Sequence, residues 1–175
     1  SVDKPNLKLN SDKFHFIKKF VGCTNNEDYI TMDEWVNSSN VRLNSDLLLQ
    51  MDIEGYEYFV LINMSNSLLN QFRIIVIEFH GLHKLWNKEF YDLASTVFDK
   101  ILQNHTCVHI HPNNCSGIDL QDGVEIPRVA EFTFIRNDRV KSKIPSIGFP
   151  HPLDFDNTAK GSISLPKNWY SGGHI

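Results

Sequence analysis

The fold of this chain is decided by the stretch Leu47-Leu48-Leu49-Gln50-Met51-Asp52-Ile53-Glu54-Gly55-Tyr56-Glu57. Its first five residues form a short, mostly apolar run, which is typical of a strand that is covered on both faces. Acidic residues and a glycine follow, and residues 56–69 then show the helical spacing of apolar side chains. The stretch therefore predicts a strand that ends at Asp52 and leads into a helix, which begins a βαβ pattern.

Strands and helices continue to alternate after this stretch. Residues 73–80 form the clearest buried strand, residues 87–103 form an amphipathic helix, and residues 107–111 form a third strand. A loop without a helix leads to a last strand at residues 130–136. Because parallel neighbours need a long crossover, we expect this last strand to run antiparallel.

The part of the chain before residue 47 has weaker patterns. Residues 1–13 are polar and predict an extended lead-in, and a short strand is expected from residue 14 to about Gly22. A loop at residues 24–28 precedes a short helix. Thr31 is a good N-cap for this helix, and Glu34 three residues later completes a capping box.

The alternation predicts an α/β fold with a mainly parallel sheet and right-handed crossovers. The length of 175 residues suits one domain with a substantial core. We expect residues 1–139 to form that domain. Residues 140–175 are rich in proline and show little periodicity, so they predict an irregular tail packed on the same domain.

Composition excludes several classes of protein. The net charge of -4 argues against a protein that binds the phosphate backbone of a nucleic acid. No apolar stretch approaches the roughly 20 residues of a membrane span. We therefore expect neither a nucleic acid nor a membrane as a partner. Cys23, Cys107 and Cys115 form no CxxC pair, so we expect reduced thiols in a cytoplasmic protein.

Polar residues gather where the predicted strands end. In an open α/β sheet, ligands bind outside the carboxyl ends of the strands. The residues at these ends are Asp52 and Glu54, then Glu78 and His80, and finally His109, His111, Asn113 and Asn114. Three strands thus bring acids, imidazoles and amides to one edge, which predicts a functional site there.

Each of these residues also has a structural interpretation. Glu54 could serve only the strand-to-helix turn, where negative charge near a helix N-terminus is favoured. Glu78 and His80 share a face and could form a buried charge pair or a capping pair. A single histidine at a strand end is usually structural, although His109 and His111 again share a face.

Two kinds of chemistry fit such an edge. A histidine or a carboxylate can take the proton of a hydroxyl acceptor. Alternatively, Asp52, Glu78 and His80 could hold a divalent metal ion, and with His111 they could form a hydrolase-like site. The spacing matches no strict metal motif such as HExxH.

The segment Met51–Glu57 resembles the (I/M)D(I/V)EGxE signature of the FkbM-type methyltransferases. Other blocks resemble the family in the same order, from about residue 14 to residue 139. They are Thr31–Val36, similar to a TLDxWI-type helix; Ile77–His80, similar to the strand after the signature; and His109–Cys115 with Pro127–Phe134, similar to the closing hairpin of one bacterial branch.

The resemblance implies a Rossmann-like class I methyltransferase fold. It also implies O-methylation that depends on S-adenosylmethionine, often of a hydroxyl on a sugar or another secondary metabolite. Together with the polar edge, it gives the predicted catalytic residues Asp52, Glu54, Glu78, His80 and His111. The predicted cofactor residues are Gly22, Asn25, Asp28 and Asp52, because the loop from Gly22 to Asp28 would lie near the adenine.

The sequence departs from the family at one point. Methyltransferases of this class bind the cofactor with a Gly-rich turn after their first strand, but the first glycine here is Gly22. We therefore expect an N-terminally truncated domain that alone binds S-adenosylmethionine weakly or not at all. Three hypotheses stay open: a methyltransferase completed by upstream residues, a silent fragment that binds partners or oligomerises through an exposed sheet edge, and the metal-dependent site.

Overall fold

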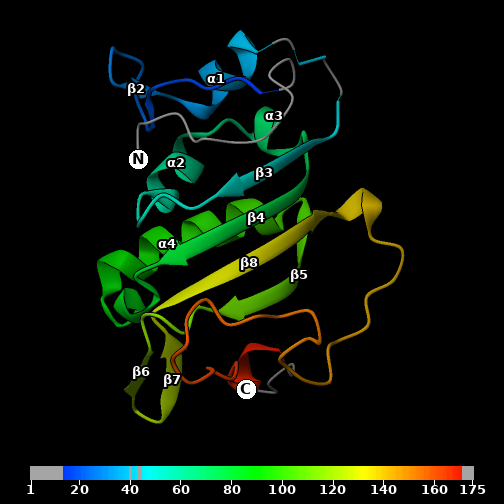
Figure 1. The fold of residues 1–175 in the computed structure, drawn as a ribbon. Helices are drawn as coiled ribbons and strands as arrows, with labels where there is room; N and C mark the ends of the chain where they lie inside the picture. Colours follow the sequence, from blue (N-terminus) through cyan, green and yellow to red (C-terminus); the bar gives the residue numbers. More distant parts are fainter. Residues whose placement is uncertain (1–13, 40, 43–44, 171–175) are drawn as a thin grey trace.

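A computed structural model describes residues 14–39, 41–42 and 45–170, so the predicted lead-in at residues 1–13 and the end of the predicted tail lie outside the described residues. Its centre is a four-stranded sheet with the order β3-β4-β8-β5 (Figure 1). The strands are β3 (Leu47–Met51), β4 (Phe72–His80), β8 (Val129–Arg136) and β5 (His105–Pro112).

The directions of these strands make the sheet mixed. β3 pairs with β4 in parallel, whereas β8 pairs antiparallel with both β4 and β5. The prediction of an antiparallel last strand is therefore confirmed. β3, β4 and β5 point the same way, with their carboxyl ends on the left of Figure 1. The expected mainly parallel sheet is not confirmed, because β8 lies between β4 and β5 and pairs antiparallel with both, which leaves β3 with β4 as the parallel pair of this sheet.

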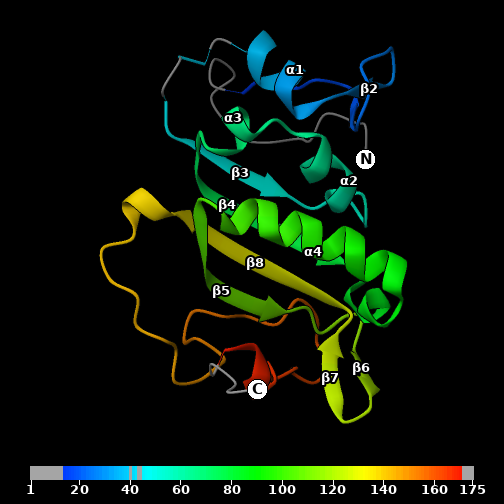
Figure 2. The same ribbon diagram turned by 180° about the vertical axis from the view of Figure 1, so that it is seen from behind.

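One face of the sheet is apolar and covered by helices. Ile75, Ile77 and Phe79 alternate along β4 and are completely buried, as the two-residue period of a strand requires. α4 (Lys88–Leu102) lies along this face (Figure 2), and its Phe98 ring lies 4.8 Å from that of Phe79. α2 (Glu57–Asn63) packs beside α4. This side forms the hydrophobic core.

The opposite face is polar. The strand register places Glu78, Glu131 and His111 opposite one another on β4, β8 and β5. The tail contacts this face: Asp154 binds His109, and Asn157 donates to Glu131 over 3.5 Å. Polar side chains that the sequence places at strand ends are therefore on one side of the sheet.

The single helix predicted over residues 56–69 is two helices, α2 and the short α3 (Asn66–Leu69). Ser65 interrupts them because its side chain accepts a hydrogen bond from Leu68 N and caps the second helix. The N–H of Ser65 donates to Asp33 Oδ2 at 2.9 Å, which ties the break to α1 (Met32–Ser38). The predicted N-cap of α1 is confirmed, since Thr31 Oγ1 accepts from Glu34 N.

Two short sheets differ from the sequence prediction. Of the strand expected from residue 14 to Gly22, only β1 (Phe20–Val21) forms, in parallel with β2 (Tyr29–Ile30). The loop expected before the last strand contains a hairpin of β6 (Ile118–Gln121) and β7 (Val124–Pro127). Its turn is Asp122-Gly123, and both residues have positive φ, as a two-residue hairpin turn requires.

Residues 140–170 pack on the β5–β7 side of the domain. The side-chain amide of Asn114 donates to the carbonyls of Thr158 and Lys160, and Leu165 is buried. The remaining short helices are η2 (Leu82–Trp86), η3 (Asn137–Arg139) and η4 (Lys167–Trp169). Within the described ranges, none of the helices combines the length and the apolar character needed to cross a bilayer.

Candidate functional site

The turn after β3 is fixed by the first residue of α2. Glu57 Oε1 accepts hydrogen bonds from the backbone N–H groups of Ile53 and Gly55, both at 3.1 Å. Glu54 and Gly55 have φ values of 58° and 103°, so the chain reverses in a conformation that L-residues rarely adopt. The turn thereby presents Asp52 and Glu54 at the carboxyl end of β3.

Four carboxylates surround the ring of His80. Its Nε2 lies 3.3 Å from Glu78 Oε2, 3.4 Å from Glu54 Oε2 and 4.0 Å from Asp52 Oδ1. Its Nδ1 lies 3.1 Å from Glu57 Oε1. We refer to Asp52, Glu54, Glu57, Glu78 and His80 as the acidic cluster. Side chains that end β3 and β4 thus meet those of the following turn and helix around one imidazole.

The acidic cluster extends from the interior to solvent. Glu57 is completely buried, the His80 side chain is 17% exposed, and that of Glu54 is 84% exposed. A pocket of about 220 Å³ opens beside the cluster, lined by Asp52 and Glu78 among others. Small polar groups can therefore reach Asp52 and Glu78 from the pocket, whereas Glu57 is closed to solvent.

Glu78 is the carboxylate of the cluster with a clear pKa shift. Burial raises the pKa of Glu78, while the hydrogen bond from Asn113 Nδ2 at 2.7 Å partly opposes the shift, and the charge of Asp52 adds to it. A raised carboxyl pKa beside a histidine is frequent in sites that move protons. Asn113, which directly follows β5, thus completes the surroundings of Glu78.

The structure gathers most of the predicted catalytic residues. Asp52, Glu54, Glu78 and His80 meet in the acidic cluster. Sequence reasoning did not single out Glu57, although it stands in the signature-like segment, because only its burial and its three hydrogen bonds show its position.

His111 is not part of the acidic cluster. It lies opposite Glu131, which in turn lies opposite Glu78, so two strand spacings of roughly 10 Å in total separate His111 from Glu78. Its Nδ1 is 3.7 Å from Asp154 Oδ2 instead. The predicted grouping of His111 with Asp52, Glu78 and His80 is therefore not what the fold produces, because β8 enters between β4 and β5.

Asp154 organises a second group of histidines. Its Oδ1 lies 2.9 Å from His109 Nε2, and its Oδ2 accepts from the backbone N–H of His151 at 2.7 Å. The group joins β5 to the tail, and its one carboxylate is shared between His109 and His111. This arrangement holds the tail against β5, which fits a structural role. A local sequence pattern could not indicate it, because Asp154 is distant along the chain from His109 and His111.

The predicted cofactor residues Gly22, Asn25 and Asp28 lie in the loop between β1 and β2. Gly22 N donates to the carbonyl of Ile30, and Asn25 Oδ1 accepts from Thr31 N at 2.8 Å. The thiol of Cys23 lies 3.4 Å from the carbonyl oxygen of Phe59 in α2. The loop is therefore anchored against the helix that begins at the acidic cluster, and Figure 1 shows both on the left.

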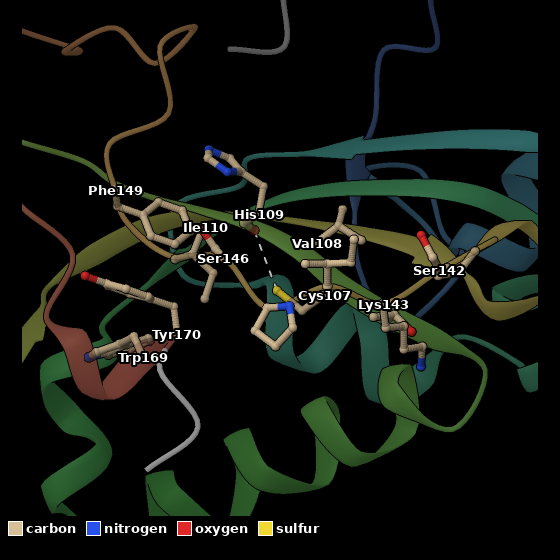
Figure 3. A pocket seen from close by; sticks show the side chains of 14 residues that line it. Cys107, Val108, His109, Ile110, Ser142, Lys143, Ser146, Phe149, Trp169 and Tyr170 are labelled. Carbon is tan, nitrogen blue, oxygen red and sulfur yellow. Dashed lines mark hydrogen bonds between the residues drawn. The ribbon is translucent and has the colours of Figure 1, made fainter.

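A larger pocket of about 430 Å³ lies between β5 and the tail. Figure 3 shows Phe149, Trp169 and Tyr170 of the tail on the same side of Cys107, while the ring of His109 lies near Phe149 and points away from Trp169 and Tyr170. Burial raises the pKa of Cys107 to about 11, so its thiol is protonated at neutral pH and a poor nucleophile. The two pockets share no lining residue. We place the candidate site at the smaller pocket because ionisable groups converge there.

The sequence of the chain also matches a known protein family. A family model described as the methyltransferase FkbM domain matches residues 10–106, more than half of the chain. The chain belongs to the FkbM methyltransferase domain family. The predicted family is thus confirmed, and the whole acidic cluster of this FkbM domain lies within the matched residues. No curated protein and no solved structure matches the chain.

Proposed function

We propose that this FkbM domain transfers a methyl group from S-adenosylmethionine to a hydroxyl oxygen of a sugar or another secondary metabolite. The observation that carries the proposal is the pair of His80 Nε2 and Glu78 Oε2, 3.3 Å apart beside the 220 Å³ pocket, in the family-matched part of the chain. The acceptor hydroxyl would bind in this pocket.

The acidic cluster suits the reaction chemically. The acceptor oxygen attacks the methyl carbon, the bond from that carbon to sulfur breaks, and S-adenosylhomocysteine leaves. The hydroxyl proton passes to a base, a role we assign to His80 Nε2, which lies 3.3 Å from Oε2 of the pocket-lining Glu78, so that the two can share the proton. The carboxylates of Asp52 and Glu54 would favour binding of the donor, whose sulfonium is positively charged.

The proposal assigns the cofactor to the β1–β2 loop and the turn after β3. Gly22, Asn25 and Asp28 would contact the adenosine part, and Asp52 would face it from the turn. The anchoring of this loop on α2 through Cys23 and Phe59 supports the assignment, because it keeps both regions on one side of the domain. We further propose a cytoplasmic location, where S-adenosylmethionine is available and the three thiols stay reduced.

The test is transfer of an isotope-labelled methyl group from S-adenosylmethionine to a panel of hydroxylated sugars and other alcohols, followed by mass spectrometry. We expect His80→Ala to lower the rate by about 10²–10⁴, the usual contribution of a positioned acid–base group. Glu89→Gln, which removes a carboxylate at the start of α4, is the matched control and should keep the rate. An unchanged rate in His80→Ala would contradict the proposed role.

A second candidate function is self-association through β3. Among the described residues, β3 is an edge strand that pairs only with β4, and its Leu48 side chain is 64% exposed. Such an edge can pair with a second copy of the chain. Light scattering after size exclusion tests this: a dimer that Leu48→Lys converts to a monomer supports it, and a monomeric wild type excludes it.

A further inference from the structure

The acidic cluster holds more negative charge than its protein partners balance. Four carboxylates lie within 4.0 Å of the ring nitrogens of His80. Among the described residues, every ion pair of these carboxylates involves that one imidazole. Even a protonated His80 would leave an excess of negative charge. Concentrated carboxylates of this kind are stabilised by a bound cation.

Glu57 gives an independent reason to expect a cation. It is completely buried, and its Oε2 has no hydrogen-bond partner. A buried carboxylate is costly unless opposite charge lies nearby. The basic group that Glu57 contacts is the ring of His80, whose Nδ1 lies 3.1 Å from Glu57 Oε1. Within the described part of the chain, the buried carboxylate of Glu57 thus has no ion-pair partner other than His80.

The hydrogen bonds of Glu57 also orient the histidine. Glu57 Oε1 already accepts from the N–H groups of Ile53 and Gly55, so it acts as an acceptor toward His80 Nδ1, which must carry the hydrogen. The lone pair of the neutral ring is then on Nε2. That atom faces Glu54 Oε2 at 3.4 Å and Asp52 Oδ1 at 4.0 Å. A carboxylate that holds the far nitrogen of a metal-binding histidine is a recurrent arrangement.

We propose that the acidic cluster binds a divalent metal ion through Asp52, Glu54 and His80, with Glu57 as a positioning residue. Ligand atoms of these three residues all lie within 4.8 Å of one another. Donors bound at about 2.0–2.2 Å to one ion lie about 3–4 Å apart, so a small contraction brings the three onto one ion. Two carboxylates and one imidazole suit Mn²⁺ or a similar transition-metal ion.

The role of the ion rests on the proposed function, whereas its binding does not. Asp52 and Glu54 are half or more exposed, so an ion held there would keep open positions toward the pocket. An acceptor hydroxyl in such a position would be oriented and would lose its proton more readily. An ion on His80 Nε2 would occupy the lone pair that otherwise takes the proton, so Glu78, which also lines the pocket, would receive the proton in place of His80.

The test is a titration of the chelator-treated chain with Mn²⁺, followed by electron paramagnetic resonance of the free ion, without S-adenosylmethionine or acceptor. We expect one site per chain. Asp52→Asn and Glu54→Gln, which change exposed side chains, should each weaken binding at least about tenfold, and His80→Ala should abolish it. Glu89→Gln is the control for a carboxylate outside the cluster, and circular dichroism verifies the fold of each variant.

Glu57→Gln tests the positioning role. Glutamine keeps the oxygen that accepts from the turn and from His80 Nδ1 but removes the negative charge behind the ring, so binding should weaken by about 10–100-fold while the fold is kept. Failure of wild type to bind Mn²⁺, or binding unchanged in Asp52→Asn and His80→Ala, overturns the metal site. Mn²⁺ binding without methyl transfer overturns only the proposed function, and methyl transfer unaffected by chelation overturns only the role of the ion.

Discussion

At the start of β3, Asp46 lies among three arginines, whereas at the end of the same strand Asp52 and Glu54 lie among other carboxylates. Asp46 accepts from Arg136 at 2.6 Å and from Arg139 at 2.7 Å. The hydrogen bond from Arg136 holds the pKa of Asp46 below its usual range, whereas burial raises the pKa of Glu78 at the other end. At the end of the sheet with Asp46, which we call the arginine end, carboxylates are paired with arginines. At the end with Asp52 and Glu54, which we call the acidic end, the carboxylates outnumber their basic partner.

This difference indicates that the arginine end contributes mainly to stability and the acidic end mainly to function. Arg136 also donates to the carbonyl of Asn70 and to Asp138, so the arginine end joins β8 to the loops before β3 and β4. At the acidic end, five ionisable groups gather where the strands' carboxyl termini open on a pocket, and their charge is left for a ligand to balance. Variants at the two ends should therefore change different properties.

The largest expected loss of stability is at the buried part of the acidic end. Glu57→Ala leaves the N–H groups of Ile53 and Gly55 without their acceptor and should lower the free energy of unfolding by about 3 kcal/mol. Glu57→Gln keeps an acceptor oxygen and should cost less than about 1 kcal/mol. Urea unfolding measures both, and equal losses would mean that the turn does not depend on this acceptor.

The second largest loss of stability is expected at the arginine end. Arg136→Ala should lower the free energy of unfolding at neutral pH by about 2 kcal/mol, since charged hydrogen bonds and a backbone contact are lost in a partly solvated place. The exposed pair of Arg128 with Asp119 is the control, and Arg128→Ala should cost less than about 1 kcal/mol.

The loss in Arg136→Ala should depend on pH. The pKa values of Asp46 and Asp138 are lowered in the folded state, so the stability they contribute is present above their ordinary pKa and is lost as pH falls through the lowered values. Wild type and variant should therefore converge in acid. A difference that stays constant down to low pH would show that packing of Arg136 matters more than its charge.

A smaller effect of opposite sign is expected for Glu78→Gln, measured with a chelator present. The pKa of Glu78 is raised in the folded state, so its favourable contribution is present below the ordinary pKa and is lost as pH rises through the raised value. Glutamine does not titrate, and the variant should gain stability relative to wild type as pH rises. A gain that is independent of pH would exclude ionisation as its cause.

The smallest change in stability is expected at Glu54. Its positive φ costs about 1 kcal/mol, which glycine would relieve, while the greater freedom of glycine in the unfolded chain costs about as much. Glu54→Gly should therefore stay within about 0.5 kcal/mol of wild type and still weaken Mn²⁺ binding. Glu89→Gly in the first turn of α4 should instead lose up to about 1 kcal/mol.

Local patterns in the sequence predicted the strands and helices of the core well. The apolar run at residues 47–51 and the amphipathic spacing at residues 87–103 each became the expected element within a few residues. The hairpin at Asp122-Gly123 also had a local signal, because this dipeptide favours a two-residue turn. The break at Ser65 was harder to predict, because it depends on a contact with Asp33 in another helix.

The candidate site was predictable only in part. The ends of β3 and β4 meet because parallel neighbours share an edge, which brings Asp52 and His80 together as expected. The position of His111 depends on where β8 inserts, and strand order cannot be read from periodicity. The contact of Asp154 with His109 spans a long stretch of irregular chain, so a local pattern could not reveal it.

α2 connects the site to the rest of the domain through both of its ends. Its first residue, Glu57, holds the His80 ring, and the ammonium of Lys100 on α4 donates to the carbonyls of Leu61, Ile62 and Met64 at its last turn. A ligand that fixes His80 therefore also fixes the beginning of this helix. The rate at which the backbone amides of α2 exchange with deuterated solvent should fall when the site is filled, which gives a measure of occupancy that needs no knowledge of the substrate.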